Sequence, residues 1–229
     1  MKILAIESAS VTASCAVSEA GALLGEYTLS HKKTHSEKLM PLIEDLLKEL
    51  DLKVQDIDAI AISEGPGSYT GLRIGAAIAK SLAFAVNIPI VNVPTTMSLA
   101  GNIFDINKFI VPIMDGKAGR IYTGIYKWDN EKLITVKEQF PCTIYELVEL
   151  LREYDESFIF NGDGSVNYRN IIVEKLNEKA YFAVNKFNYL SASTLASIAY
   201  EKVLRGELIK ATEFKPQYLR LSQAERNKK

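Results

Sequence analysis

The stretch Ser63–Lys80, SEGPGSYTGLRIGAAIAK, places three glycines between the end of an apolar run and the start of a helical pattern. A strand, a glycine loop and a helix in that order can point backbone N–H groups at an anion. The spacing fits no standard phosphate motif, because Gly71-Leu72-Arg73 stands where a P-loop needs Gly-Lys-Ser/Thr. The pattern therefore favours placement of the helix over phosphate binding. As the alternative, a nucleotide would contact Glu7, Gly65, Gly67 and Ser68.

The helix that follows the glycines, which we expect to end near Val86, carries two stripes of side chains. The larger apolar residues predict a face that packs on a sheet: Ile74, Ile78, Leu82 and Ala85. Small residues form the second stripe at four-residue steps: Gly71, Gly75, Ala79 and Ala83. Small side chains allow another backbone to approach closely, so this stripe predicts a second neighbour. That neighbour is either another protein or the helix at Leu39–Leu50 of the same lobe.

The order of elements, β-β-β-α-β-α-β, occurs twice along the chain and predicts two similar α/β lobes. The first lobe is expected over residues 1–100, with strands at Lys2–Ile6, Ala13–Glu19, Leu23–Ser30, Asp58–Ser63 and Ile88–Val93. The second is expected over residues 101–229, with strands at Phe109–Asp115, Arg120–Trp128, Lys132–Glu138, Phe158–Phe160 and Ala180–Val184. A helix over Ser193–Leu204 closes the second lobe, and the terminal tail can pack back on the first. A linker is expected at Leu99–Lys108.

The composition narrows the classes of function. The chain has 229 residues, 27 Lys and Arg against 28 Asp and Glu, and a net charge of -1, which argues against a broad basic surface for nucleic acid. The two cysteines, Cys15 and Cys142, are expected to be buried thiols in a reducing cytoplasm. The apolar start is too short for a secretory signal, and charged or proline residues interrupt every longer apolar run.

Other polar groups have ordinary structural interpretations that we favour. His31 and His35 have the i, i+4 spacing of metal ligands, but only Glu37 is a third candidate nearby, so solvated histidines are expected. Thr34 with Glu37 fits a helix-capping box, with Ser36 as an alternative cap. The stretch Asp115–Arg120 is expected to be a hairpin turn, and Asn161–Gly164 a loop before a helix. The tail from Arg220 is basic and could touch tRNA, although a solvated terminus is the simpler interpretation.

Several segments, in order and over nearly the whole chain, resemble one bacterial family. They are MKILAIESAS, HSEKLMPLIEDLL, EGPGSYTGLRIGAAIAKSLA, IPIVNVPTTMSLA, DGKAGRIYTGIY, NGDG and PQYLRLSQAE. The family is that of the tRNA threonylcarbamoyladenosine biosynthesis protein TsaB, also called YeaZ. The resemblance implies two ribonuclease-H-like lobes of the actin, sugar kinase and Hsp70 (ASKHA) class. Glu7 stands where many such proteins have Asp.

The resemblance also implies the division of roles. A longer catalytic relative, TsaD, binds metal through two histidines in a V-N-H-x-x-x-H stretch. Their positions fall near Thr95 and Leu99 here, and neither side chain can ligate a transition metal in that role. The family therefore implies a non-catalytic cytoplasmic subunit that works with a TsaD-like subunit and a TsaE-like ATPase on tRNA. It implies no cofactor of its own, with ATP or ADP at the partner boundary as an open possibility.

In the family, the partner surface comes from the two helices that here span about Ser36–Leu50 and Gly71–Val86, and the same surface can form a homodimer. We expect the following residues at that surface: Leu39, Met40, Ile43, Gly71, Arg73, Gly75, Ala79, Lys80 and Ala83. A stand-alone ATPase or phosphotransferase using Glu7, the glycine loop and Asp115 is the alternative. Protease activity has no support, because the sequence offers neither a nucleophilic triad nor a metal centre.

Overall fold

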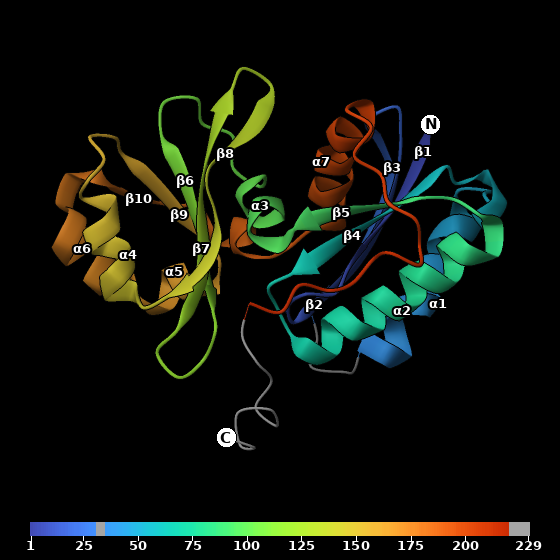
Figure 1. The fold of residues 1–229 in the computed structure, drawn as a ribbon, viewed down its shortest axis with the longest axis horizontal. Helices are drawn as coiled ribbons and strands as arrows, with labels where there is room; N and C mark the ends of the chain where they lie inside the picture. The colour runs from blue at the N-terminus through green and yellow to red at the C-terminus, as the bar shows by residue number, and fades with distance from the viewer. Residues whose placement is uncertain (31–34, 220–229) are drawn as a thin grey trace. The chain divides into compact units, whose positions relative to one another are not determined.

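A computed structural model describes residues 1–30 and 35–219, with the side chains of residues 35 and 36 left out (Figure 1). The contacts divide the chain into two compact units. Unit 1 comprises Met1–Ser98 and the chain from Leu190 onward, and unit 2 comprises Leu99–Tyr189. In the part of the chain that is described, no helix is both long and apolar enough to cross a bilayer.

Unit 1 is built on a five-stranded sheet with the order β3-β2-β1-β4-β5. The strands are β1 (Lys2–Glu7), β2 (Thr12–Glu19), β3 (Ala22–Ser30), β4 (Ala59–Gly65) and β5 (Ile90–Pro94). The first three form an antiparallel meander, and β4 and β5 continue the sheet in parallel with β1. The unbroken apolar run of β1 reflects its central place, because helices cover a central strand on both faces.

Three long helices cover this sheet: α1 (His35–Glu49), α2 (Tyr69–Val86) and α7 (Ala192–Leu204). The neighbouring residues Gly25 and Glu26 of β3 show that α1 and α7 lie on opposite faces. Gly25 faces Leu46 of α1, whereas Glu26 accepts hydrogen bonds at the start of α7. A short helix, α3 (Thr95–Ala100), follows β5, and a 3-10 turn (Val54–Asp56) precedes β4.

Unit 2 repeats this topology with the strand order β10-β9-β6-β7-β8. The strands are β6 (Phe109–Asp115), β7 (Ile121–Asp129), β8 (Lys132–Cys142), β9 (Phe158–Asn161) and β10 (Ala180–Phe182). The helices are α4 (Ile144–Leu151), α5 (Asp163–Asn167) and α6 (Arg169–Leu176), with 3-10 turns at Asn177–Lys179 and Asn185–Asn188. The duplicated order of elements is therefore confirmed.

The expected extent of the second lobe, residues 101–229, is wrong at its C-terminal end. Helix α7 follows β10 in sequence but packs on β1 and β2 of unit 1. The segment after α7 also belongs to unit 1, as the alternative for the terminal tail allowed. Its Ala211 and Phe214 join the core, and Ile209 bridges to Ile90. Order along the chain could not reveal this, because the helical pattern of α7 fits either sheet.

Other expectations for the fold have mixed outcomes. Both cysteines are buried free thiols, as expected, and burial raises the pKa of Cys15 and of Cys142 to about 12. Helix α1 begins at His35, so Pro41 lies inside it. The proposed cap at Thr34 or Ser36 and the histidine side chains at positions 31 and 35 lie outside the described residues and side chains.

The carboxylate of Glu26 fastens α7 to the sheet. It accepts hydrogen bonds from the Ser191 hydroxyl (2.9 Å), the Ser193 N–H (3.0 Å) and the Ser193 hydroxyl (2.9 Å), and from Ser14 at 3.2 Å. Its half-burial alone would raise the pKa, but these donors outweigh the burial and lower the pKa of Glu26. The charged form is therefore the one that holds the start of α7 in place.

Replacing Glu26 with glutamine should lower the free energy of unfolding by about 1.5 kcal/mol at pH 7, because two or more charge-assisted hydrogen bonds weaken. A lowered folded-state pKa means that the wild-type contribution is present at neutral pH and is lost as the pH falls through that pKa. Urea unfolding at pH 7 and pH 3 measures both effects. Equal stability of the two proteins at pH 7 would contradict the assignment.

Candidate functional site

In the loop between β4 and α2, the N–H groups of Gly65 and Ser68 form hydrogen bonds within unit 1. The Gly65 N–H donates to the Thr95 hydroxyl (3.1 Å) and the Ser68 N–H to the Ala9 carbonyl (2.7 Å). The Ser68 hydroxyl caps α2 by accepting from the Gly71 N–H at 3.2 Å. These donors are therefore used within the chain rather than presented to an anion.

The glycines of this region allow backbones to approach one another. A Cβ atom on any of Gly65, Gly67, Gly71 or Gly75 would lie under 3.0 Å from another atom of unit 1. The atoms in the way are the Gln217 carbonyl for Gly65, the Ala9 carbonyl for Gly67, and the carbonyl and hydroxyl of Ser8 for Gly71 and Gly75. The turn after β1 and the C-terminal segment thus pack so closely on these glycines that no side chain would fit there.

Glu7 ends β1 in a fully buried position beside this loop. One carboxylate oxygen accepts from the Ala9 N–H (2.8 Å) and the other from the Ser63 hydroxyl. Burial raises the pKa of Glu7 to about 7, and the hydrogen bonds offset only part of that effect. The side chain is closed to solvent, so this structure does not offer it to a metal or a nucleotide. The expected contact of Glu7, Gly65 and Gly67 with a nucleotide therefore finds no support in the geometry. Ser68, the fourth expected residue, is exposed, but its hydroxyl caps α2 and its N–H bonds to the Ala9 carbonyl.

The small-residue stripe of α2 takes the sheet-facing place that was expected for the larger residues. The small-residue stripe faces the sheet of unit 1, with Gly71, Gly75, Ala79 and Ala83 all buried. The larger residues Ile74, Ile78 and Leu82 lie half-buried at the edge of the same core. The cause is the Ser8 turn, which crosses the first two turns of α2 so closely that no side chain fits.

The expected partner surface is therefore wrong for the residues that point inward. Gly71, Gly75, Ala79 and Ala83 of α2 cannot be reached from outside unit 1, and neither can Leu39 and Ile43 of α1, which are fully buried. Met40 is half-buried, Arg73 is exposed, and Lys80 is half-buried. The residues of α2 that do face outward are Tyr69, Thr70, Arg73, Ala77, Ser81, Phe84 and Ala85.

The C-terminal segment, residues 209–219, lies along α2 and is named the strap here (Figure 1). Phe214 is 2% exposed and anchors the strap in the core. The Lys80 ammonium donates to the Phe214 carbonyl (3.1 Å), and the Gln217 N–H donates to the Glu64 carbonyl (2.6 Å). Near its end, Tyr218 contacts Tyr69 and Arg73. Lys80 was expected at the rim of the partner surface. Its ammonium group instead fastens the strap to α2.

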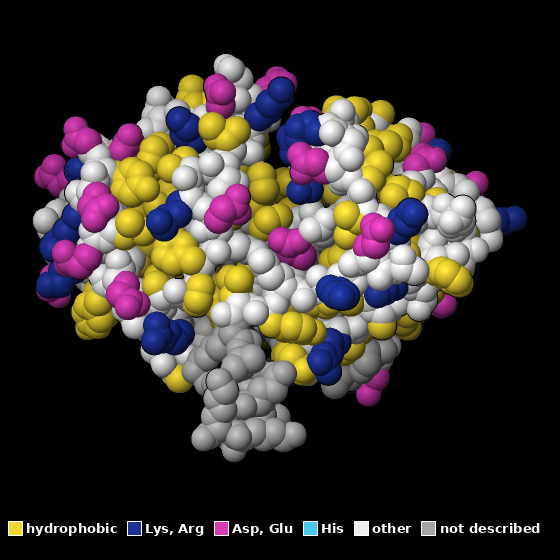
Figure 2. Space-filling model, viewed as in Figure 1, with side chains coloured by type: hydrophobic (Ala, Val, Ile, Leu, Met, Phe, Trp, Pro, Cys, Tyr) yellow, Lys and Arg dark blue, Asp and Glu magenta, His cyan; other side chains and the backbone are white. Residues whose placement is uncertain are grey.

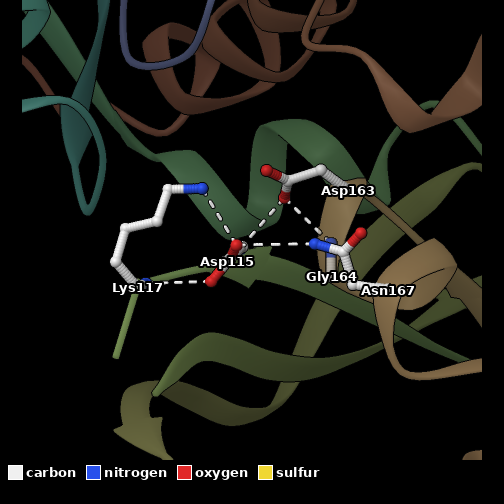
Figure 3. A network of polar contacts seen from close by, with 5 residues as sticks. All are labelled: Asp115, Lys117, Asp163, Gly164 and Asn167. Carbon is white, nitrogen blue, oxygen red and sulfur yellow. Dashed lines mark hydrogen bonds and ion pairs between the residues drawn. The ribbon is translucent and has the colours of Figure 1, made fainter. Parts of the chain in front are cut away.

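The turn between β6 and β7 forms a second polar cluster, in unit 2 (Figure 3). Asp115 accepts from the Lys117 N–H and ammonium, both at 2.9 Å, and from the Asn167 amide at 3.4 Å. Asp163 accepts from the backbone N–H groups of Asp115 and Gly164, each at 2.9 Å. Burial opposes ionisation, but the bonds to Lys117 lower the pKa of Asp115. The cluster is a turn fastened to α5, as expected for Asp115–Arg120. The loop expected at Asn161–Gly164 is shorter, because Asn161 ends β9 and α5 begins at Asp163, which leaves Gly162 between them.

Comparison with known proteins decides the family. A protein-family model described as "TsaD: tRNA N6-adenosine threonylcarbamoyltransferase" matches residues 22–228. The tRNA threonylcarbamoyladenosine biosynthesis protein TsaB of Bacillus subtilis (strain 168) is 34% identical over 225 residues, which cover 98% of this chain and 96% of that protein. This chain belongs to the TsaB family.

Solved structures confirm the ASKHA-type fold. YeaZ from Pseudomonas aeruginosa superposes with a TM-score of 0.80 at 24% identity, covering 95% of this chain and 99% of that chain. A ROK hexokinase from Thermus thermophilus, a sugar kinase, gives a TM-score of 0.52 at 13% identity, covering 90% of this chain and all (100%) of the hexokinase. At such identities the likeness establishes the fold and nothing further.

Within this TsaB-family chain, the two positions compared with the TsaD histidines have structural roles. The Thr95 hydroxyl accepts the Gly65 N–H, and Leu99 is 2% exposed. Among the described side chains of residues 1–30 and 37–219, no three His, Cys, Asp or Glu groups cluster as metal ligands would. The family model carries the description of a transferase, but the side chains at these two positions are not metal ligands.

Sequence reasoning missed how far the C-terminal strap and the Ser8 turn shape this TsaB-family site. Neither segment has a periodic pattern, so nothing in the sequence indicated that Ser8 and Tyr218 meet α2 or that Gln217 meets the end of β4. The glycine spacing was the available signal, since glycines at Gly71 and Gly75 require some close neighbour. It could not say whether that neighbour came from the same chain.

Proposed function

We propose that this chain is a non-catalytic subunit that scaffolds and activates a TsaD-like transferase, which installs threonylcarbamoyl on the tRNA adenosine next to the anticodon. Membership of the TsaB family supports a role in tRNA threonylcarbamoyladenosine biosynthesis. The observation that carries the non-catalytic role is the glycine loop, which packs against the chain's own Ser8, Ala9 and Gln217 and donates the Gly65 and Ser68 N–H groups within the chain. We infer from this that the chain acts by holding another subunit.

The geometry favours this role over a stand-alone ATPase or phosphotransferase. That reaction would need Glu7, the glycine loop and Asp115 to reach substrate or metal. Glu7 is fully buried, the loop packs against its own chain, and Asp115 is bonded to Lys117 and Asn167 of its own unit. We propose that the chain has no cofactor of its own and that ATP or ADP enters through the TsaD-like and TsaE-like subunits.

The proposed pairing surface is the outward face of α2, in place of the inward stripe. Ala77 and Ser81 are small and exposed, and Phe84 is 76% exposed at the end of the same face. Small residues with an exposed aromatic side chain allow a second helix to approach and to bury apolar area. We propose that the same face supports a homodimer when the chain is alone.

Charge over the visible face agrees with tRNA being held by the complex rather than by this chain. Among the side chains that Figure 2 colours, Lys and Arg are interspersed with Asp and Glu, and these described residues form no broad basic area on that face. The net charge of -1 points the same way. We propose that tRNA contacts come mainly from the other subunits.

An Ala77→Arg substitution should weaken binding to the TsaD-like subunit at least about tenfold, because it places a large charge in the middle of the proposed pairing face. The fold should be unaffected, since Ala77 is exposed. Calorimetric titration of the two subunits, with circular dichroism of the variant, measures both effects. Lys186→Ala, an exposed position in unit 2, is the control. Full-strength binding by Ala77→Arg would contradict this surface.

The function itself is tested by reconstitution. The TsaD-like and TsaE-like subunits of the same organism are assayed for threonylcarbamoyl transfer to tRNA with and without this chain. We expect modification only when this chain is present, and no ATP turnover by this chain alone. Transfer at the full rate without it, or ATP hydrolysis by the purified chain, would refute the proposal.

A further inference from the structure

One buried asparagine links the two ends of unit 2. Asn161 is the last residue of β9 and is fully buried. Its side-chain amide donates to the Leu99 carbonyl (2.7 Å) and to the Phe187 carbonyl (3.1 Å), two bonds that are named the Asn161 clamp here. Asn102 adds a further link, from its amide to the Tyr189 carbonyl (2.7 Å). Unit 2 begins at Leu99 and ends at Tyr189, so the clamp closes this unit where the chain enters and leaves it.

The clamp depends on the amide group of Asn161 rather than on the shape of its side chain. Both partners are carbonyl oxygens, so only a donor satisfies them. Among the described residues, the remaining atom, Asn161 Oδ1, has no hydrogen-bond partner. An aspartate carboxylate at this position would have no proton to donate and would bring a buried charge against two carbonyl oxygens. Conversion of Asn161 to aspartate would therefore break the clamp.

The residue after Asn161 makes that conversion chemically accessible. Gly162 follows it, and no other asparagine in the 229 residues precedes a glycine. Glycine has no side chain to hinder attack by its backbone nitrogen, so Asn-Gly is the sequence that deamidates most readily. The Gly162 nitrogen bonds to Asn161 Cγ while the Cγ–Nδ2 bond breaks, and the Gly162 proton leaves with the ammonia. Water then opens the cyclic imide to aspartate or isoaspartate.

The folded unit holds this reaction back at each step. The Gly162 N–H donates to Asn188 Oδ1 at 3.0 Å, so its proton is engaged. The leaving nitrogen of Asn161 is bonded to two carbonyls. Gly162 is packed so closely on the Ile113 carbonyl that even a methyl group would collide with it, which leaves no room for a ring to form. Both residues are buried away from water. The reaction therefore requires unit 2 to open.

We propose that Asn161-Gly162 is a latent deamidation site that turns opening of unit 2 into a permanent change. While unit 2 is closed, the clamp and the packing protect Asn161. When unit 2 opens, cyclisation competes with closing. The aspartate or isoaspartate product cannot restore the clamp, so the converted chain keeps an open unit 2. The working life of the folded chain thus depends on how often this unit opens.

The first test follows Asn161 in the isolated wild-type chain. Folded chain and chain unfolded in guanidinium chloride are incubated at the same pH and temperature, and peptide mass spectrometry measures conversion of the amide. We expect Asn161 to convert at least about a hundredfold more slowly in the folded chain, because only the open fraction reacts. In the unfolded chain Asn161 should convert faster than Asn170, which precedes an isoleucine. Folded and unfolded rates within about threefold of each other would overturn the proposal.

The second test asks whether the product breaks the clamp. Asn161→Asp introduces the carboxylate directly, and Asn170→Asp is the matched control, because it makes the same chemical change at an exposed residue of α6. We expect backbone hydrogen exchange in unit 2 to speed up at least about tenfold in Asn161→Asp and to stay within about twofold of wild type in the control. Failure of unit 2 to fold in Asn161→Asp alone is the stronger form of that result. Wild-type exchange in Asn161→Asp would overturn the proposal.

Discussion

Replacing Gly71 with alanine should lower the free energy of unfolding of unit 1 by about 3 kcal/mol, the upper part of the range for overpacking a close-packed site. The added methyl group would lie under 3.0 Å from the carbonyl of Ser8. That oxygen belongs to the backbone of the turn after β1, so it cannot swing aside as a flexible side chain could. Either α2 or the turn has to move. Urea unfolding followed by circular dichroism measures the loss.

Ser81→Ala is the matched control, because Ser81 is an exposed residue of the same helix. Its stability should stay within about 0.5 kcal/mol of wild type, as for most surface substitutions. The same geometry predicts that Gly75→Leu damages the fold of unit 1, whereas an outward-facing glycine stripe would lead to a well-folded chain that fails to bind. A stable Gly71→Ala protein would show that the Ser8 turn does not hold this place in solution.

Replacing Glu7 with glutamine should stabilise the protein by about 3 kcal/mol at pH 8, since a shift of one pKa unit corresponds to about 1.4 kcal/mol. Burial raises the pKa of Glu7 from the ordinary 4.5 to about 7 in the folded chain. The folded state therefore holds the proton more tightly than the unfolded state does. The contribution of Glu7 to the stability of the wild type is fully present below pH 4.5 and is lost as the pH rises through about 7.

Glutamine removes that dependence and keeps a carbonyl oxygen for the Ala9 N–H, while its amide can donate to the Ser63 hydroxyl. Urea unfolding from pH 4 to pH 8 should give a flatter profile for Glu7→Gln than for wild type, with the curves meeting at low pH. Glu26→Gln supplies a contrast of opposite sign, because the pKa of Glu26 is lowered. Parallel stability profiles for Glu7→Gln and the wild type would contradict the raised pKa of Glu7.

Much of the fold could be predicted because its elements have strong local patterns. The central strand β1 is apolar on both faces, and α4 begins with a Thr143–Glu146 capping box before a regular apolar face. Such patterns depend on residues close together in the chain, and the duplicated order of elements follows from them. The 3-10 turns and the division of residues 163–176 into α5 and α6 lack a comparable signal and were not foreseen.

The candidate site was less predictable, because segments that are distant in sequence build it. The small-residue stripe of α2 indicated a close neighbour, but the larger Ile74 and Ile78 seemed the natural sheet-facing side. The rule that larger apolar residues face the sheet fails here because the Ser8 turn leaves no room for side chains. Arg73 was expected at the surface, where it lies, but its stacking on Tyr218 depends on the path of the strap.

The sequence by itself determined the elements, their duplicated order and the family, because periodicity, caps and motif residues are properties of neighbouring positions. Only the tertiary structure decided that α7 and the strap belong to unit 1, that the glycines admit the chain's own backbone, and which face of α2 is exposed. Each of these depends on close packing between segments far apart in the chain. Such packing is set by the shapes of both surfaces together, and neither segment's sequence encodes it alone.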